Sequence, residues 1–259
     1  MADREIYPHT PLALVAVEIR HPTALPLTDL GRAKLKSQMA STFPLAKPSQ
    51  RMTITPTATT MNTDTRFMSR DRTSSVTFRD DAIVVETTRY ERRSVLRGML
   101  REAVLARQEA APVDGVERLG IRYVNEVRVP DLDSPTEWQA WIAPALTSPS
   151  TLGTANGQQV QTWQGVTVFG DAQNGIVVRH GVFEGYAVNP AGDLQRPAPP
   201  PGPFFLIDLD CYWMPAGDTP PLEWELIDPH FDQASIAAYA LFEQLITDNL
   251  REGVLRREN

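Results

Sequence analysis

The sequence predicts an α+β fold in which helices pack on one face of a mostly antiparallel sheet. The stretch Glu117–Val129 alternates apolar and polar residues, a period of two that is typical of a strand with one buried and one polar face. Two dipeptides, Asp80-Asp81 and Asn174-Gly175, lie between strand-like runs and predict hairpins, which join antiparallel strands. Apolar stripes at helical spacing supply the helices.

Composition narrows the class of protein. The chain has 259 residues, 42% of them apolar, which suffices for a sizeable core. A net charge of -7 argues against a general nucleic-acid binder, because such proteins must neutralise phosphates. Cys211 is the only cysteine, which excludes an intrachain disulfide and a site built from several thiolates. Without a signal region or a membrane-length apolar run, we expect a soluble cytoplasmic protein that has no membrane contact.

The first half, residues 1–130, is predicted to form a complete α+β section. Its expected elements are a strand at Leu12–Arg20, a helix at Asp29–Ser41, a strand near Met52–Thr57, strands at Ser74–Arg79 and Ala82–Tyr90, a helix at Val95–Glu109 and the strand Glu117–Val129. Thr28 and Ser94 are the expected N-caps of the two helices, because a hydroxyl can accept from an unpaired amide of the first turn.

The second half, residues 131–259, repeats the pattern. Its expected elements are a short helix begun by Ser134-Pro135, strands at Gln159–Phe169 and Gly175–Tyr186, a stiff proline-rich surface spacer at 189–203, strands at Phe204–Trp213 and Leu222–Ile227, and a helix at Gln233–Glu252 capped by Asp228-Pro229 or Asp232. Two such sections predict two similar halves, packed together or merged in one single domain.

Several pieces of the chain form a recognisable set. They are the run R-L-G-I-R-Y-V-N at Arg118–Asn125, Pro11-Leu12, the strand ending at Tyr90, L-I-D-L-D at Leu206–Asp210 and F-x-x-L-I-T-D at Phe242–Asp248. Together they resemble a sporadically distributed bacterial family of about this length with an RLGxRYxN motif and no characterised function. The resemblance implies no activity. A patchy distribution often accompanies mobile elements, such as defence or toxin–antitoxin loci.

The run that carries this motif also offers binding residues: Arg118, Arg122, Tyr123 and Asn125. Arg122 points to the polar face of its strand, whereas Tyr123 and Asn125 share the apolar face. A buried asparagine must find hydrogen-bond partners. Asn125 is therefore expected either to pin a neighbouring segment or to contact a ligand.

Four carboxylates form a second candidate group: Asp208, Asp210, Glu223 and Glu225. Each pair lies two residues apart on an expected strand, so each pair projects from one face. Converging from adjacent strands, the four could hold Mg²⁺ or Mn²⁺ and act on phosphoesters. A simpler interpretation pairs them across strands with Arg118, Arg122 and Arg128.

The first hypothesis is a non-enzymatic binding protein with a macromolecular partner, either another protein or a second copy. No zinc spacing, nucleophile elbow or dinucleotide fingerprint occurs, so no cofactor is expected. The first alternative is the metal-dependent phosphoester enzyme that would use Asp208, Asp210, Glu223 and Glu225. The second is a small-molecule pocket in the sheet with Tyr123 or Asn125 at its wall.

Overall fold

A computed structural model of the chain describes residues 7–54, 59–130, 132, 135–152, 157–158 and 160–257. The strands are β1 (Leu12–Arg20), β2 (Leu45–Ala46), β3 (Ser49–Ile54), β4 (Thr59–Met68), β5 (Ser74–Phe78), β6 (Ala82–Thr87), β7 (Arg118–Val127), β8 (Gln164–Gly170), β9 (Asn174–Glu184) and β10 (Pro203–Trp213). The long helices are α1 (Asp29–Met39), α2 (Arg93–Ala110) and α4 (Trp224–Leu245). Short helical segments are α3 (Pro144–Thr147), α5 (Asp248–Leu250), 3-10 turns at Pro135–Ala140 and Ser148–Thr151, and a π-helical turn at Arg251–Leu255.

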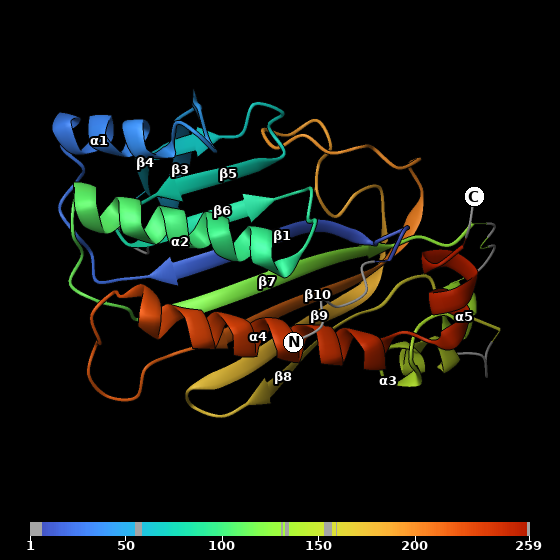
Figure 1. Cartoon of the computed structure of the whole chain (residues 1–259). Coiled ribbons are helices and arrows are strands. Elements are labelled where there is room, and N and C mark those ends of the chain that lie inside the picture. Colours follow the sequence, from blue (N-terminus) through green and yellow to red (C-terminus); the bar gives the residue numbers. More distant parts are fainter. Residues whose placement is uncertain are drawn as a thin grey trace.

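The described strands form one antiparallel ten-stranded sheet in the order β2-β4-β5-β6-β1-β7-β10-β9-β8, with β3 paired to β4 (Figure 1). This confirms the predicted α+β class. β7 lies in the middle, where it pairs with β1 on one side and β10 on the other. Strands from residues 1–130 and from residues 131–259 therefore belong to the same sheet, and β7 is the strand at which they meet.

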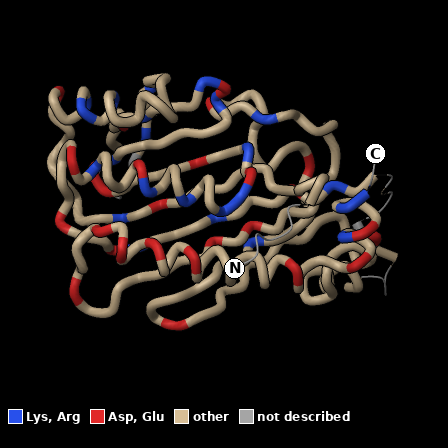
Figure 2. The backbone as a smooth tube through the Cα atoms, in the orientation of Figure 1, with Lys and Arg blue, Asp and Glu red and all other residues tan. Residues whose placement is uncertain are grey.

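Helices α1, α2 and α4 lie along one face of the sheet (Figure 1). Thr28 caps α1 as predicted, because its Oγ1 accepts a hydrogen bond from Gly31 N at 3.1 Å. α2 and α4 are joined by ion pairs of Arg97 with Asp228 and of Arg93 with Asp232. Acidic positions recur along α4 in Figure 2, and two of them, Asp228 and Asp232, pair with arginines of α2. We call the sheet face beneath these helices the helix face.

The helix face holds the core. Alternate residues of β7, including Leu119, Ile121 and Val127, are fully buried there, as the period of two predicts. Trp138 from the 3-10 turn is also fully buried and packs on Phe205 of β10, with ring centroids 5.5 Å apart. Such aromatic pairs contribute large buried areas, so this contact fixes the Pro135–Ala140 turn against the sheet.

The predicted strand Leu222–Ile227 is wrong. α4 begins at Trp224, and Trp224, Ile227 and Phe231 are buried at helical spacing. Pro229 was expected to mark the start of this helix but lies in its second turn. The proline ring suits the φ angle of a helix and costs one N–H near the terminus, a loss that burial of this apolar stripe offsets.

Three smaller predictions differ from the structure. Ser94 is not an N-cap, because α2 already begins at Arg93 and Leu96 N bonds Arg92 O. β4 was not predicted, since its threonines do not show the clean alternation of a half-buried strand. The β8–β9 turn is centred before Asn174, where Asp171 Oδ1 accepts from Gln173 N and Asn174 N at 2.8 Å each.

Some predictions fall outside the described residues. These are the cap at Ser134, the end of the strand near Met52–Thr57, and Gln159. None of the helices in the described part of the chain has the length and apolar character needed to cross a lipid bilayer.

The segment 185–202, which we call the strap, contains most of the run 189–203 that was predicted to be a stiff surface spacer. Instead it is bonded to distant parts of the sheet. Asp193 pairs with Arg66 of β4 at 3.1 Å, and Arg196 pairs with Glu126 of β7 at 2.7 Å. The strap therefore leaves β9, reaches β4 on the far side of β1, and returns past β7 to β10.

Candidate binding site on the open face of the sheet

The sheet face opposite the helices, called here the open face, carries the polar residues of the central strands. Because side chains alternate along a strand, the burial of Ile121 and Leu209 on the helix face places Arg122 and Asp208 on the open face. The two side chains are joined by a pair of hydrogen bonds, from Arg122 Nε and Nη2 to the Asp208 oxygens at 2.8 and 2.6 Å. These bonds raise the pKa of Arg122, so the guanidinium stays charged.

Arg118, at the start of β7, forms a similar pair with an aspartate of β10. Its Nη2 donates to both oxygens of Asp210 at 2.9 and 3.0 Å. To reach this carboxylate, the arginine folds over Gly120, where a Cβ atom would lie 2.1 Å from the guanidinium Nη1. The glycine of the R-L-G-I-R-Y-V-N run is therefore required by the close approach of its neighbour. Both pairs confirm the simpler interpretation of the two aspartates.

Arg122 differs from Arg118 in how much of it reaches solvent. Asp208 is almost fully buried, whereas the Arg122 side chain is 51% exposed, against 16% for Arg118. Arg179 of β9 is 42% exposed and approaches the same Asp208 at 3.8 Å. One carboxylate thus faces two half-exposed guanidinium groups. These three side chains together carry a positive charge, and both cations are accessible.

A hollow of about 320 Å³ lies beside this pair. Its lining is mostly apolar and comes from four strands and the strap: Leu14, Arg122, Val124, Phe183, Glu184, Tyr186, Ala187, Val188, Phe204, Leu206 and Asp208. Arg122 is the one cation in this lining. The hollow therefore combines apolar walls with one half-exposed cation, Arg122, and two carboxylates, the buried Asp208 and the exposed Glu184.

The wall formed by the strap is held by Glu126. This buried carboxylate accepts hydrogen bonds from Arg128 Nε at 2.8 Å, from Arg196 Nη2 at 2.7 Å and from Ala187 N at 2.8 Å. Arg128 also donates to the carbonyl oxygens of Gly185 and Gly202, the two ends of the strap. Glu126 and Arg128 thus fix the segment that carries Tyr186 and Val188 into the hollow.

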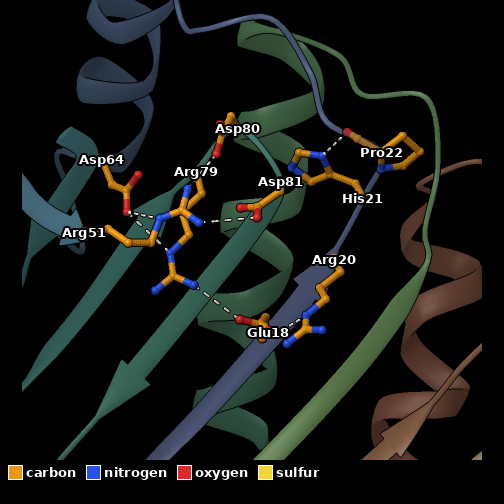
Figure 3. A network of polar contacts seen from close by, with 9 residues as sticks. All are labelled: Glu18, Arg20, His21, Pro22, Arg51, Asp64, Arg79, Asp80 and Asp81. Atoms are coloured by element: carbon orange, nitrogen blue, oxygen red, sulfur yellow. Dashed lines mark hydrogen bonds and ion pairs between the residues drawn. The ribbon is translucent and has the colours of Figure 1, made fainter. Parts of the chain in front are cut away.

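Away from the hollow, the charges of the open face pair with one another (Figure 3). Arg51 and Arg79 share Asp64, at 3.3 and 3.5 Å. Glu18 then lies 3.3 Å from Arg79 and 3.9 Å from Arg118. Opposite charges so alternate from β3 across the sheet to β7, which leaves Arg122 and Arg179 as the more exposed cations next to the hollow.

Tyr123 and Asn125, the other two predicted binding residues, lie on the helix face. Tyr123 donates to Ser235 of α4 at 3.3 Å and contacts Tyr90 edge to face. Asn125 is 3% exposed, and its Nδ2 donates to Ile207 O at 2.9 Å. Neither residue lines the hollow, and both link β7 to neighbouring elements. This hollow is therefore not the pocket expected at Tyr123 or Asn125, which stays a prediction.

Replacing Asn125 tests its role as a link between strands. We expect Asn125→Leu to lower the free energy of unfolding by about 1–2 kcal/mol, because a buried hydrogen bond to Ile207 O is lost. Urea denaturation followed by tryptophan fluorescence measures the change. Full stability together with lost ligand binding would contradict this structural role.

The four predicted metal ligands are not brought together. Asp208 and Asp210 lie on β10 and bond arginines, whereas Glu223 and Glu225 lie at the start of α4 on the other side of the sheet. The described residues contain no group of three or more histidine, cysteine, aspartate or glutamate side chains that could hold a metal ion. The prediction that the four carboxylates converge from adjacent strands is wrong, because Leu222–Ile227 is not a strand.

Cys211 and two histidines, His21 and His180, are buried, and His230 is half-buried. Burial raises the pKa of the Cys211 thiol to about 12, so it is not a nucleophile at neutral pH. Burial lowers the pKa of His21, His180 and His230. His21 is 1% exposed, with Nδ1 within 2.8 Å of Pro22 O (Figure 3) and Nε2 without a partner among the described residues.

These histidines predict a pH dependence of stability. Each pKa is lower in the folded chain than the ordinary value of about 6.5, so the unfolded chain binds more protons below that pH. The contribution of the neutral histidines to the free energy of unfolding should be fully present above pH ~7. It should fall as the pH drops through ~6.5, by up to about 1.4 kcal/mol per pH unit for each histidine. Urea denaturation between pH 7.5 and 5.5 measures the slope. His21→Asn should reduce it, whereas the exposed-site variant His9→Asn serves as the control.

No protein-family model matches the chain, and no curated protein matches it. The resemblance to the sporadically distributed bacterial family stays a prediction.

Most of the residues that shape the hollow and its surroundings were not predicted from the sequence. Arg118 and Arg122 were singled out, but Arg179, Glu126 and the strap were not. A charged residue on a strand gives no sign of whether it is paired or exposed. One signal was present, since Tyr186 and Val188 are apolar residues at the end of a strand, next to the proline-rich run.

Proposed function

We propose that this chain is a non-enzymatic binding protein that receives part of a protein partner in the hollow of the open face. The observation that carries the proposal is the half-exposed Arg122 at the wall of a mostly apolar hollow. Asp208 accepts hydrogen bonds from Nε and Nη2 of this arginine, and Nη1 has no partner among the described residues. The ligand expected is a segment with an apolar side chain next to a carboxylate.

A protein partner fits better than a small ligand because the accessible surface continues beyond the hollow. Arg179 lies on β9, two strands from Arg122 and outside the lining, and is almost as exposed as Arg122. A ligand confined to the hollow would reach only one of these cations. A protein segment crossing from β7 to β9 reaches both.

The test uses one variant in the hollow and one matched variant elsewhere. Val188→Glu places a carboxylate in the hollow, where it competes with the ligand for Arg122. Leu30→Glu makes the same kind of change at a leucine of α1 that is 70% exposed. Proteins captured from a lysate of the producing cells by the unmodified chain are identified by mass spectrometry, and the dissociation constant of each purified candidate is measured.

We expect a partner whose affinity falls at least tenfold with Val188→Glu and is unchanged with Leu30→Glu. Equal affinity for both variants would overturn the proposal, as would a failure to capture any partner. Thermal melting followed by circular dichroism establishes that both variants are folded.

A small molecule is the second candidate, favoured by the size of the hollow. Its volume of about 320 Å³ lies at the lower end of the range for small-molecule sites. Native mass spectrometry of protein purified from the producing cells would then show an added mass, and Val188→Glu would remove it.

A further inference from the structure

The two edges of the sheet differ in how they are protected. At one edge β2 and β3 both pair with β4. β2 has only two residues, and the edge carries Pro44, Lys47, Pro48 and Arg51, prolines and charges that oppose pairing with another chain. At the other edge β8 has seven residues, Q-G-V-T-V-F-G, with no charge and no proline. β8 lies beyond α4 at the border of the sheet (Figure 1).

β8 is exposed on both faces of the sheet. Val166 and Val168 are 65% and 62% exposed on the open face, and Phe169 is 48% exposed on the helix face. A long, flat, uncharged edge with exposed apolar side chains is a template for pairing with another strand.

The backbone hydrogen bonds to β9 decide which residues of β8 can pair with a further strand. Val182 N donates to Trp163 O at 3.1 Å, and Asp171 N donates to Asn174 O at 2.8 Å. These bonds lie at the two ends of β8, and with the antiparallel register they direct the odd-numbered residues toward β9. The N–H and C=O groups of Gln164, Val166, Val168 and Gly170 therefore point outward.

These four residues are self-complementary. We propose that two copies of this chain associate through antiparallel pairing of their β8 strands, around a twofold axis at Thr167. This register places Val166 opposite Val168 of the second copy and Gln164 opposite its Gly170, so each outward-pointing residue meets another. The two sheets then form one continuous sheet.

The side chains also agree with this register. On the open face, valine meets valine, a favourable cross-strand pair. On the helix face, Phe169 of one copy meets Gly165 of the other, where the His180 imidazole lies 2.5 Å from the position that a Cβ of Gly165 would take. The glycine leaves room for an aromatic ring beside this imidazole. Since β8 carries no charge, the twofold axis brings no like charges together.

The axis at Thr167 allows a charge-reversal test. Thr167 is exposed and meets itself across the axis, so Thr167→Lys places two ammonium groups opposite each other and Thr167→Glu places two carboxylates there. Each variant alone should be a monomer. An equal mixture of the two should form a heterodimer, because lysine then faces glutamate.

Sedimentation equilibrium over a range of concentrations measures the outcome. The unmodified chain should pass from 28.8 kDa to twice that mass as concentration rises, since an interface of one strand is small. Thr60→Lys, at an exposed threonine of β4, should dimerise normally. A monomeric unmodified chain at every concentration overturns the proposal, even if β8 binds a peptide strand of another protein. A dimer that survives Thr167→Lys, or a mixture that stays monomeric, overturns it too.

Discussion

Glu126→Ala is expected to lower the free energy of unfolding by about 3–5 kcal/mol, because it removes a buried charge from two arginines that remain in place. Glu126 accepts from Arg128 and Arg196, whose side chains are only 19% and 7% exposed. Without the carboxylate, both guanidinium groups lose their counter-charge away from water. Urea denaturation at pH 7.5 measures the change.

The same variant should loosen the strap. Ala187 N loses its acceptor, and residues 185–202 lose the contact that holds them over β7. Limited proteolysis should therefore cleave within this segment faster than in the unmodified chain. Glu109→Ala, at an exposed position near the end of α2, is the control and should stay within about 0.5 kcal/mol of the unmodified chain. A loss below about 1 kcal/mol for Glu126→Ala would contradict the anchoring role.

Arg122→Leu is expected to lower the free energy of unfolding by about 2–3 kcal/mol, because Asp208 then stays buried with only the more distant Arg179 near it. The double variant Arg122→Leu/Asp208→Leu should recover most of this loss, since no buried charge is left unpaired. Urea denaturation of the four proteins in this cycle gives the coupling free energy.

The control for this cycle is the exposed pair of Arg20 with Glu18, in which the arginine is 57% exposed. Arg20→Leu should cost less than about 1 kcal/mol. If Arg122→Leu cost as little, Asp208 would not depend on Arg122, and the arginine would serve the ligand alone. A large coupling instead means that Arg122 stabilises the sheet and presents Nη1 to the hollow at once.

Much of the fold could be predicted from local pattern. The alternation in Glu117–Val129 identified the central strand, because one polar and one buried face leave a period of two in any sequence. Thr28 identified the start of α1, because a hydroxyl before a helix has a local partner. The hairpin around Asp80-Asp81 followed from turn chemistry and is confirmed by the pairing of Phe78 with Ile83.

Local pattern failed where distant contacts decided the outcome. L-E-W-E-L-I at 222–227 alternates like a strand, yet Trp224 and Ile227 are also one turn apart. Burial beneath the sheet, together with Phe231, selects the helix. The strap was expected to be a free spacer because its prolines resemble a linker. Its role depends on Glu126, which lies 70 residues from Arg196 in the sequence.

The sequence by itself determined the α+β class and the central strand, because strand periodicity is local and general. It left the pairing of Arg118 and Arg122 with Asp210 and Asp208 as one of two interpretations. Only the tertiary structure decided that Tyr123 and Asn125 lie in the core and that Glu223 and Glu225 lie away from β10. It also decided that Arg122 stands at the wall of a hollow, and that β8 is an unprotected edge. Exposure and proximity depend on how the strands are ordered in the sheet, and that order is set by contacts between residues far apart in the chain.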